Sequence, residues 1–403
     1  MADRLKLSVE DYLAEVSALV APVADAEDVP LVEAIGRTLA EPVTSRVDIP
    51  TFTNSAMDGF AVRHDTVQVG DDVPEVADVP AGSEEDPALG AGQCVRIMTG
   101  APVPTEADTI IPRELVDELD GGIRINELPA KGRHVRHAGE DLQAGAVVLA
   151  TGAVLGPHEL ALAASCGVPT VRVVRHPRVV VVATGDELRA PGEELQRGQL
   201  YESNRFHLGL CANRDGAEVV ASVVLPDDPE EFAAGLDEAV AAGADLVVMS
   251  GGVSVGDHDV ARIVLSDRAE GTFRHVHMQP GKPQGWAWWQ GVPVVALPGN
   301  PLSAAVSYEL FVRPLIERML GRAPRAWVPA VVAEGWTPPA RRQFIPVVVD
   351  VDAEGRRCVR PAHVRGSASH MVSVLTRADA LADVPAETPG VNPGDVVMIR
   401  SLR

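Results

Sequence analysis

Three loops of this chain combine hydroxyl groups, carboxylates and glycines directly after short apolar runs. They span residues 184–188, 250–259 and 298–303. Each apolar run has the length and β-branched composition of a buried parallel strand. In open α/β sheets, ligands bind at the carboxyl ends of the strands, so we expect the three loops to form one ligand site.

The residue types of the loops indicate which ligand they would hold. Amides in such loops attract phosphate-like oxyanions, and carboxylates beside a phosphate commonly share Mg²⁺ with it. The hydroxyls are Thr184, Ser250, Ser254 and Ser303, and the carboxylates are Asp186, Glu187, Asp257 and Asp259. These groups predict a phosphorylated ligand held with a divalent cation. Positive charge for a second anion is available from His275, Lys282, Arg341 and Arg342.

Three familiar catalytic or nucleotide motifs are absent from the sequence. Gly251 to Gly256 has the glycine spacing of a P-loop, but Asp257-His258 follows where Lys-Ser/Thr is needed. No G-x-G-x-x-G opens a helix, and no G-x-S-x-G is present, which removes the dinucleotide fingerprint and the hydrolase elbow. The loops therefore bind a phosphorylated ligand in some other way.

Composition excludes several classes of protein. With 35 basic and 57 acidic residues, the net charge of -22 argues against a nucleic-acid surface. No apolar run approaches the roughly 20 residues of a membrane span, and the N-terminus lacks a signal pattern. We expect a cytoplasmic protein of several domains, because 403 residues exceed one ordinary core.

Other residues that could bind ligands have simpler interpretations. The four cysteines have no C-x-x-C spacing and are expected in the core. His275 and His277 share one face of an expected strand and could ligate a metal, although a half-exposed strand face is the simpler explanation. The tryptophans from 286 to 289 fit a strand at the core edge or a dimer contact better than a binding stripe.

The order of the expected elements defines the domains. Helices are expected from Ser8 to Val20, from Leu31 to Ala40 and from Pro157, and we expect them to pack together. A β-rich segment interrupts them, and strands alternate with helices from Arg178, which predicts a parallel, doubly wound sheet. A small β-barrel follows, with strands expected at 328–332, 344–351, 357–359 and 395–399. The predicted division is a helical linker domain (1–45 and 141–175), an inserted β-rich domain (46–140), an α/β domain (176–321) and a C-terminal β-barrel (322–403).

The order of short motifs along the chain resembles the molybdopterin molybdenumtransferase family, which includes bacterial MoeA proteins and the E domain of gephyrin-like proteins. The motifs are Asn54-Ser-Ala-Met-Asp-Gly59, Arg96-Ile-Met-Thr-Gly-Ala-Pro102, Gly139-Glu-Asp141, Thr184-Gly-Asp-Glu-Leu188, Ser203-Asn204, Ser250 to Asp259, Pro280-Gly-Lys-Pro283 and Leu297 to Ser303. Each is weak alone, but eight occur in register over nearly the whole chain.

The resemblance implies a multidomain fold with a MogA-like α/β domain, and an elongated homodimer. It implies a reaction in which adenylylated molybdopterin and molybdate give molybdenum cofactor and AMP, with Mg²⁺ assisting. It leaves open whether a separate molybdopterin adenylyltransferase docks on the protein.

The resemblance also assigns roles to individual residues. It implies catalytic roles for Asp58 and Thr99, which would come from the partner subunit, and for Glu187, Asp227 and Asp259. The last three would also hold Mg²⁺. The implied substrate-binding residues are Ser250, Gly251, Gly252, Ser254, Lys282, Pro298, Gly299, Asn300, Pro301, Arg341 and Ser369.

Two departures from the family pattern reduce the positive charge near the implied anion site. Gln279 stands where the family usually has a Lys before Pro-Gly-Lys-Pro, and Arg341 to Pro346 keeps only the first expected Arg. They motivate one alternative, a weakly active paralogue that binds pterin or partner proteins as a scaffold. A nucleotide-binding oxidoreductase is the other alternative, and it has only the general α/β pattern in its favour.

Overall fold

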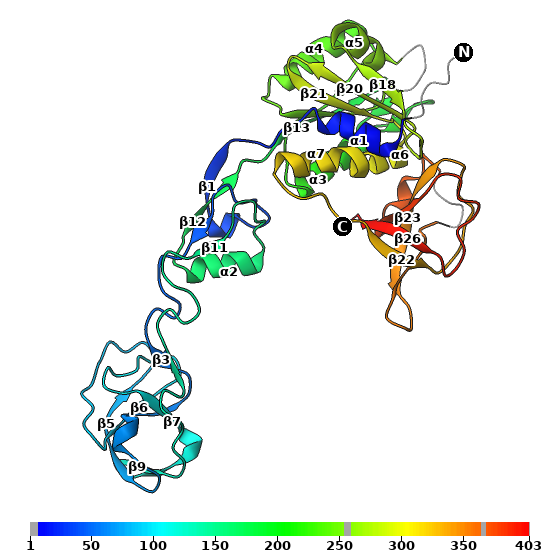
Figure 1. The fold of residues 1–403 in the computed structure, drawn as a ribbon. Helices are drawn as coiled ribbons and strands as arrows, with labels where there is room; N and C mark the ends of the chain where they lie inside the picture. Colours follow the sequence, from blue (N-terminus) through cyan, green and yellow to red (C-terminus); the bar gives the residue numbers. More distant parts are fainter. Residues whose placement is uncertain (1–6, 254–258, 364–367, 403) are drawn as a thin grey trace. The chain divides into compact units, whose positions relative to one another are not determined.

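The chain forms two compact units in a computed structural model that describes residues 7–253, 259–363 and 368–402. The smaller unit comprises Asp28–Val173. The larger unit combines the residues up to Glu27 with those from Val174 onward. The larger unit contains the α/β sheet and the barrel, and the smaller unit contains the β-rich insertion (Figure 1). The finer division into four domains stays a prediction.

A six-stranded sheet forms the centre of the larger unit, in the order β16-β13-β17-β21-β20-β18. The strands are β13 (Arg178–Thr184), β16 (Glu218–Leu225), β17 (Leu246–Ser250), β18 (Thr272–His275), β20 (Pro283–Trp289) and β21 (Val292–Leu297). The first four in the sheet order are parallel, as predicted. The expectation of a wholly parallel sheet is wrong at one edge, because a tight turn at Gln290 and Gly291 makes β20 and β21 an antiparallel hairpin and β18 adds antiparallel to it.

Helices cover both faces of this sheet, which confirms the doubly wound prediction (Figure 1). Alternate valines of β13 point to opposite faces: Val179 and Val181 pack in one core cluster, and Val180 and Val182 pack in the other. The first cluster includes residues of α1 (Val9–Ser17), α3 (Asn204–Arg214), α6 (Pro301–Ser307) and α7 (Arg313–Met319). The second includes residues of α4 (Pro229–Val240) and α5 (Val260–Arg268).

Local sequence signals set several helix starts. The Ser8 hydroxyl accepts a hydrogen bond from the Asp11 N–H at 3.0 Å, which caps α1. At α4, the Asp228 carboxylate accepts from the N–H groups of Glu230 and Glu231, both at 3.0 Å, and Pro229 takes the first helical position. Helix α1 therefore begins where the sequence predicts, and the cap at Asp228 with Pro229 explains the start of α4.

The C-terminal residues form a closed five-stranded barrel, which confirms the prediction of a small β-barrel. Its strands are β22 (Val328–Val332), β23 (Arg342–Val351), β24 (Arg357–Pro361), β25 (Ala380–Val384) and β26 (Val396–Ser401). Strand β25 was not expected, because Ala-Leu-Ala-Asp-Val lacks the β-branched run that marks the others. The two-residue strand β19 (Met278–Gln279) pairs with β23 and connects the hairpin region to the barrel.

The smaller unit contains a six-stranded sheet in the order β7-β4-β6-β5-β9-β8, which confirms the β-rich insertion. Its strands are β4 (Gly59–Val62), β5 (Asp72–Val79), β6 (Cys94–Ile97), β7 (Thr109–Pro112), β8 (Val116–Leu119) and β9 (Gly122–Ile125). The rest of the unit has short strand pairs, β2 (Val43–Thr44) with β11 (Val147–Leu149) and β3 (Asn54–Ser55) with β10 (Val135–Arg136), and the helix α2 (Pro157–Ser165). Strand β12 (Thr170–Val174) pairs with β1 (Ala26–Pro30).

Two expectations about helices are wrong. A 3₁₀ turn at Leu31–Glu33 replaces the helix expected from Leu31 to Ala40. Gly36 follows at φ 73°, a left-handed conformation that ends helical propagation. The expected packing of α1 with α2 is also wrong: Tyr12 of α1 meets Phe311 edge to face at 4.8 Å in the larger unit, whereas Ala163 of α2 lies in a core cluster of the smaller unit.

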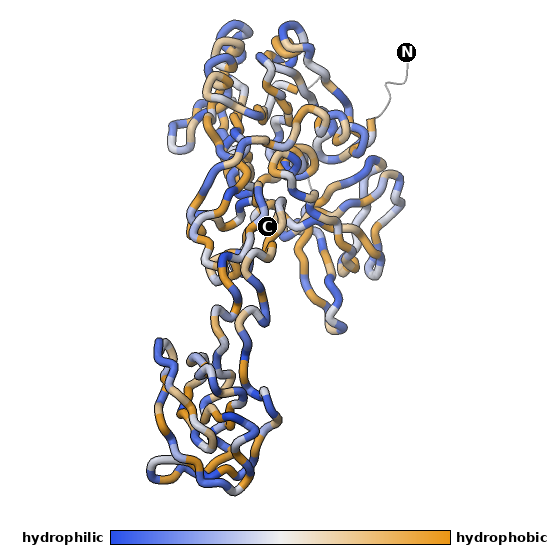
Figure 2. The backbone as a smooth tube through the Cα atoms, turned by 60° about the vertical axis from the view of Figure 1, so that its left-hand side comes forward, coloured by the Kyte–Doolittle hydropathy of each residue, from blue (hydrophilic) through white to orange (hydrophobic). Residues whose placement is uncertain are grey.

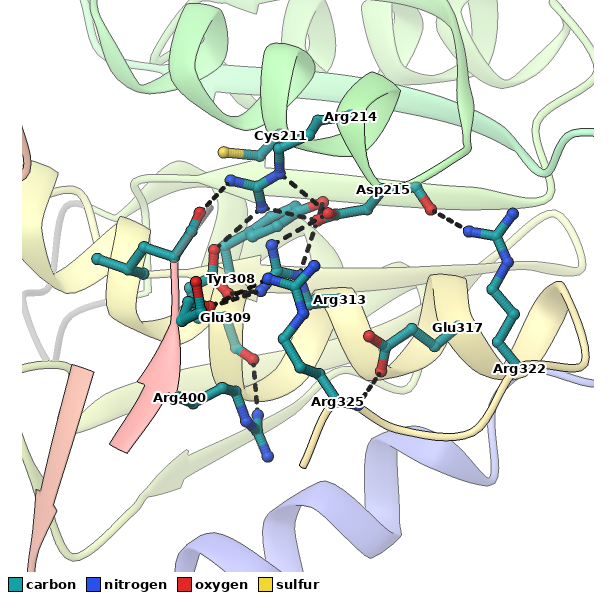
Figure 3. A network of polar contacts seen from close by, with 12 residues as sticks. Cys211, Arg214, Asp215, Tyr308, Glu309, Arg313, Glu317, Arg322, Arg325 and Arg400 are labelled. Atoms are coloured by element: carbon teal, nitrogen blue, oxygen red, sulfur yellow. Dashed lines mark hydrogen bonds and ion pairs between the residues drawn. The ribbon is translucent and has the colours of Figure 1, made fainter. Parts of the chain in front are cut away.

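A buried ionic cluster lies where α3 ends, and we define it as Arg214, Asp215, Tyr308, Glu309 and Arg313. The Asp215 carboxylate accepts from Arg313 Nε and Nη2 and from Arg214 Nε and Nη2, each at 3.0 Å, and from the Tyr308 hydroxyl at 2.8 Å. The Arg313 side chain is 1% exposed and also pairs with Glu309. Figure 3 shows these side chains pointing toward one another. Both oxygens of the buried Asp215 carboxylate are therefore neutralised.

The buried ionic cluster also holds the barrel. Arg214 donates to the Leu402 carbonyl at 2.7 Å, and Arg400 donates to the Glu309 carbonyl at 3.2 Å (Figure 3). Glu309 lies in a π-helical turn, Tyr308–Val312, between α6 and α7. This turn precedes Pro314, whose ring would clash with a carbonyl of a regular helix, so the wider turn accommodates it.

Hydrophobic and hydrophilic residues alternate in short stretches along the described backbone (Figure 2). No helix in the described ranges combines the length and the apolar character needed to cross a membrane.

Candidate functional site

A cavity of about 770 Å³ opens at the carboxyl ends of β13, β17 and β21 in the larger unit. All three predicted loops contribute to it. Its lining from these loops includes Thr184, Gly185, Glu187, Ser250, Gly251, Gly252, Val253, Asp259, Pro298, Gly299, Asn300 and Pro301. Strand order reverses between β13 and β17, so the cavity lies at the topological switch point where α/β sheets bind ligands. The sequence-based expectation that the loops meet is confirmed.

Close backbone approach in the cavity wall requires two of the predicted glycines. A Cβ at Gly251 would lie 2.8 Å from the Thr184 hydroxyl oxygen, and one at Gly252 would lie 2.6 Å from the Cβ of Ala261. Their φ angles of 101° and 66° are also in the left-handed region. Glycine at both positions leaves the peptide groups of the loop accessible to a ligand.

Asn204, the first residue of α3, ties two of the loops together. Its side-chain amide donates to the Ser250 hydroxyl at 2.8 Å and to the Gly299 carbonyl at 2.6 Å. The Ser250 hydroxyl in turn donates to the Pro298 carbonyl at 3.3 Å. Ser250 is 2% exposed and is therefore engaged in holding the loops, although it borders the cavity.

The three carboxylates predicted to bind metal all line the cavity, but their hydrogen bonding differs. The Asp227 carboxylate accepts from the Asp186 N–H at 3.1 Å, and the Asp186 carboxylate accepts from the Asp227 N–H at 3.3 Å. Asp259 Oδ2 is buried and has no hydrogen-bond partner in the part of the chain that the structure describes. Glu187 folds back so that its carboxylate lies close to Gly185. Asp259 is thus the carboxylate that most needs an external partner.

No group of three or more His, Cys, Asp or Glu side chains able to hold a metal ion lies within the described ranges. His275 ends β18, and His277 lies beyond it, so the two are not on one strand face as the sequence suggested. The shared strand face on which the alternative of a histidine metal site depended is therefore absent from β18. The expectation of core cysteines is confirmed for Cys94, Cys166 and Cys211, which are buried, and burial raises the pKa of Cys211 to about 11. It is wrong for Cys358, which is only half-buried.

The predicted cations and the barrel serine lie outside the described lining of the cavity. Lys282 is exposed next to the lining residue Pro283. Arg341 directly precedes β23. Ser369 accepts a hydrogen bond at its carbonyl from the Leu302 N–H of α6 at 3.0 Å, and its neighbour His370 borders the cavity. Ser254, also predicted to bind substrate, lies outside the described residues.

Asp58 and Thr99 lie in the smaller unit and form a pair. Both the Thr99 N–H and the Thr99 hydroxyl donate to Asp58 Oδ1 at 2.7 Å. These hydrogen bonds lower the pKa of Asp58 and keep it ionised. Both residues are exposed, as are their neighbours Met57 and Met98, which are 36% and 47% exposed.

Comparison with known proteins decides the family. Residues 7–167 match the MoeA N-terminal region (domain I and II), residues 180–318 match the probable molybdopterin binding domain, and residues 329–402 match the MoeA C-terminal region (domain IV). The chain is 39% identical over 389 residues to molybdopterin molybdenumtransferase 2 of Mycobacterium tuberculosis, covering 93% of this chain and 94% of that protein. It belongs to the molybdopterin molybdenumtransferase (MoeA) family.

Two further relatives agree with this membership. The molybdopterin molybdenumtransferase of Haemophilus influenzae is 34% identical over 374 residues, covering 92% of each chain. The crystal structure of a molybdopterin biosynthesis MoeA protein from Pyrococcus horikoshii superposes with a TM-score of 0.83 and 31% identity, covering 98% of this chain and 99% of that one. The whole chain therefore has the MoeA fold, including the MogA-like α/β domain.

Residue-by-residue reasoning on this MoeA-family chain missed part of the cavity wall. Leu200, Tyr201 and Glu202 reach it from the connection between β13 and α3, and His370 reaches it from the barrel. Asn204 was part of a family motif, but its role in joining two loops follows only from the hydrogen bonds. A Ser-Asn pair just before a helix was the available signal for Asn204. No local signal marks His370, because it reaches the site only when the barrel packs on α6.

Proposed function

We propose that this chain is a transferase of molybdenum cofactor biosynthesis that uses molybdate to convert adenylylated molybdopterin to molybdenum cofactor, with release of AMP. The observation that carries the proposal is Asp259, a residue of the cavity wall at the sheet switch point whose Oδ2 is buried and has no described hydrogen-bond partner. A carboxylate in that position can bind a cation, and the negatively charged oxygens of a pyrophosphate would bind the same cation. Family membership supplies the substrate class.

The residues of the cavity fit Mg²⁺ of the kind that accompanies a pyrophosphate. Mg²⁺ keeps several water ligands and usually takes one or two carboxylates together with substrate oxygens, so a cluster of three protein ligands is not required. Asp259 would hold it, with Glu187 and Asp227 on the same wall. When bound, the ion would neutralise charge that develops as the phosphoanhydride bond breaks.

The chain's own groups would position the substrate. The loop at Gly251 and Gly252 offers accessible peptide groups for phosphate oxygens. Pro298, Gly299, Asn300 and Pro301 would frame the pterin side. Lys282 and Arg341 form no ion pair among the described residues, and they would supply positive charge for the terminal phosphate and molybdate. His370 closes the wall from the barrel and would limit access of water.

The direct test is a single-turnover reaction of purified protein with adenylylated molybdopterin, molybdate and Mg²⁺. We expect stoichiometric AMP and a cofactor that activates a molybdenum-free apoenzyme. Absence of both products would refute the transferase and would favour the scaffold alternative, which Gln279 motivates. Binding of a nicotinamide or flavin cofactor would instead favour an oxidoreductase.

The active form is proposed to be a homodimer in which Asp58 and Thr99 of the partner subunit complete the cavity. The support is that this ordered pair lies exposed beside the apolar side chains of Met57 and Met98, and an exposed apolar surface is typical of an interface. Phe52, 45% exposed, extends the same kind of surface. A cytoplasmic location is proposed from the sequence pattern, and docking of a molybdopterin adenylyltransferase is proposed from the resemblance.

Mixed dimers test the shared site. Asp58→Ala and Asp259→Ala should each be inactive alone. After co-refolding of equal amounts, half of the dimers are mixed and each has one intact site, so about a quarter of wild-type activity should return. No recovery, in samples shown by mass to contain mixed dimers, would contradict a site shared between subunits.

A further inference from the structure

A second cavity, of about 610 Å³, lies in the barrel and shares no lining residue with the first. Its volume is in the range of small-molecule sites. The described lining consists of Glu334, Gly335, Trp336, Val348, Arg360, Pro361, Ala362, His363 and Arg377. Apolar groups dominate the wall, with cationic side chains beside an aromatic ring. This combination is unlike the oxygen-rich first cavity.

The aromatic ring is held in a fixed position. The Trp336 indole N–H donates to Gln343 Oε1 at 2.9 Å. Its backbone N–H and carbonyl both bond to Val391, each at 2.9 Å. Gly335 is required beside it, because a Cβ there would lie 2.5 Å from the Val391 carbonyl oxygen. The ring therefore offers a pre-positioned apolar surface on which a flat ligand group can stack.

The two arginines of the cavity differ from two other arginines of the barrel in their described ion pairs. Arg342 and Arg356 of the same barrel form ion pairs with Asp383 and with Asp352. Arg360 and Arg377 form no ion pair with a described carboxylate, and both are exposed at the cavity. The net charge of the chain is -22, so its overall field repels anions. Two guanidinium groups without a described ion pair in one cavity provide local anion affinity.

We propose that this barrel cavity binds a nucleoside monophosphate, with the base stacked on Trp336 and the phosphate on Arg360 and Arg377. Glu334 on the same wall is an acceptor for an amino group or a ribose hydroxyl. The choice of AMP as the nucleotide rests on the proposed function, because AMP is the product that the first cavity would release. The cavity would then hold product outside the reaction site.

Isothermal titration of the full-length protein with AMP tests the proposal. We expect saturable binding that Arg360→Ala and Arg377→Ala each weaken about tenfold, because each removes a charge-assisted hydrogen bond. Trp336→Leu should weaken AMP binding while leaving the weaker binding of inorganic phosphate unchanged. Arg356→Ala is the matched control: it removes an arginine of the same barrel that is already paired, and it should bind AMP like the wild type.

Three outcomes would overturn the proposal. The first is that Arg360→Ala and Arg377→Ala both bind AMP as tightly as the wild type. If Asp259→Ala alone removes AMP binding, the nucleotide occupies the first cavity and the proposal fails in the same way. Equal affinity for inorganic phosphate and AMP would show that the ring makes no contribution. Loss of AMP binding in Arg356→Ala to the same extent would indicate a general charge effect. A negative AMP-release assay with barrel binding intact would refute only the proposed transferase.

Discussion

The buried ionic cluster and the first cavity lie at opposite ends of the same helices. They differ in whether their buried carboxylate oxygens have hydrogen-bond partners. Helix α3 begins at the cavity with Asn204 and ends in the cluster with Arg214, and the helix that starts at Pro301 leads into the π turn with Glu309. In the cluster, both oxygens of Asp215 have partners. In the cavity, Asp259 Oδ2 has none among the residues described.

This difference indicates that the ionic cluster serves stability and that the cavity serves function. A buried carboxylate without a partner costs free energy, and such a cost is retained at sites whose partner arrives as a ligand. A fully paired cluster instead fixes the geometry on which the site depends. Arg214 of the cluster donates a hydrogen bond to the carbonyl of Leu402, near the end of the barrel. The barrel region also supplies Ser369, whose carbonyl bonds to α6, and His370, which lines the cavity. Variants of the two regions should therefore fail in different assays.

The largest effect is expected from Arg313→Met. Removing this buried guanidinium leaves Asp215 and Glu309 partly unpaired, which should lower the free energy of unfolding by about 3–5 kcal/mol. Denaturant unfolding followed by circular dichroism measures it. Arg356→Met, at an exposed pair, should cost less than about 1 kcal/mol. Equal costs for the two variants would mean that the cluster does not contribute specially to stability.

Asp259→Asn should show the reverse behaviour. We expect AMP release to fall about a hundredfold or more, since the site loses charge that serves the reaction. The free energy of unfolding should not fall, because the substitution removes the charge of a carboxylate whose buried oxygen has no described partner. Asp267→Asn, on the exposed side of the same helix α5, is the control and should retain full activity. Unfolding of the Asp259 variant would show that the carboxylate is structural.

The pH dependence of stability should depend on Asp215. Hydrogen bonds and ion pairs with Arg214 and Arg313 outweigh burial and lower the pKa of its carboxyl in the fold. The stabilisation is therefore complete above the unfolded pKa of about 3.9 and is lost as the pH falls through the lower folded value. The stability difference between wild type and Asp215→Asn should narrow between about pH 5 and pH 3. A difference that is constant with pH would contradict this pairing.

The smallest effect is expected from Gln279→Lys, which restores a cation that the family usually has. Gln279 lies on β19, paired with Gln343 of β23, so the new charge would lie near the start of the barrel strand that follows Arg341. The molybdate concentration for half-maximal AMP release should fall by about two- to fivefold, as for one partly screened charge. Gln68→Lys, exposed in the smaller unit, should leave it unchanged. No difference between the two variants would mean that other groups set molybdate affinity.

The amino-acid sequence by itself determined the parallel strands of the α/β sheet, four of the five barrel strands, several helices and the three cavity loops. These features depend on local patterns: valine runs for β13, caps at Ser8 and Asp228 for α1 and α4, and glycines where the chain must approach closely. The helix expected from Leu31 to Ala40 and the missing β25 show where the local pattern is too weak to choose between states. Motif order also identified the family, since eight short motifs in register are improbable by chance.

Only the tertiary structure decided which polar groups have partners. Asp215, Asp227 and Asp259 look alike as acidic residues in loops or at helix ends. In the described parts of the chain, Asp215 is fully paired, Asp227 accepts a backbone N–H, and Asp259 has a buried oxygen without a partner. Arg356 and Arg360 lie four residues apart in the barrel sequence, yet Arg356 has a described ion pair and Arg360 has none. Hydrogen bonds and ion pairs join residues that are distant in sequence, here by 98 positions between Asp215 and Arg313, so no local pattern encodes them.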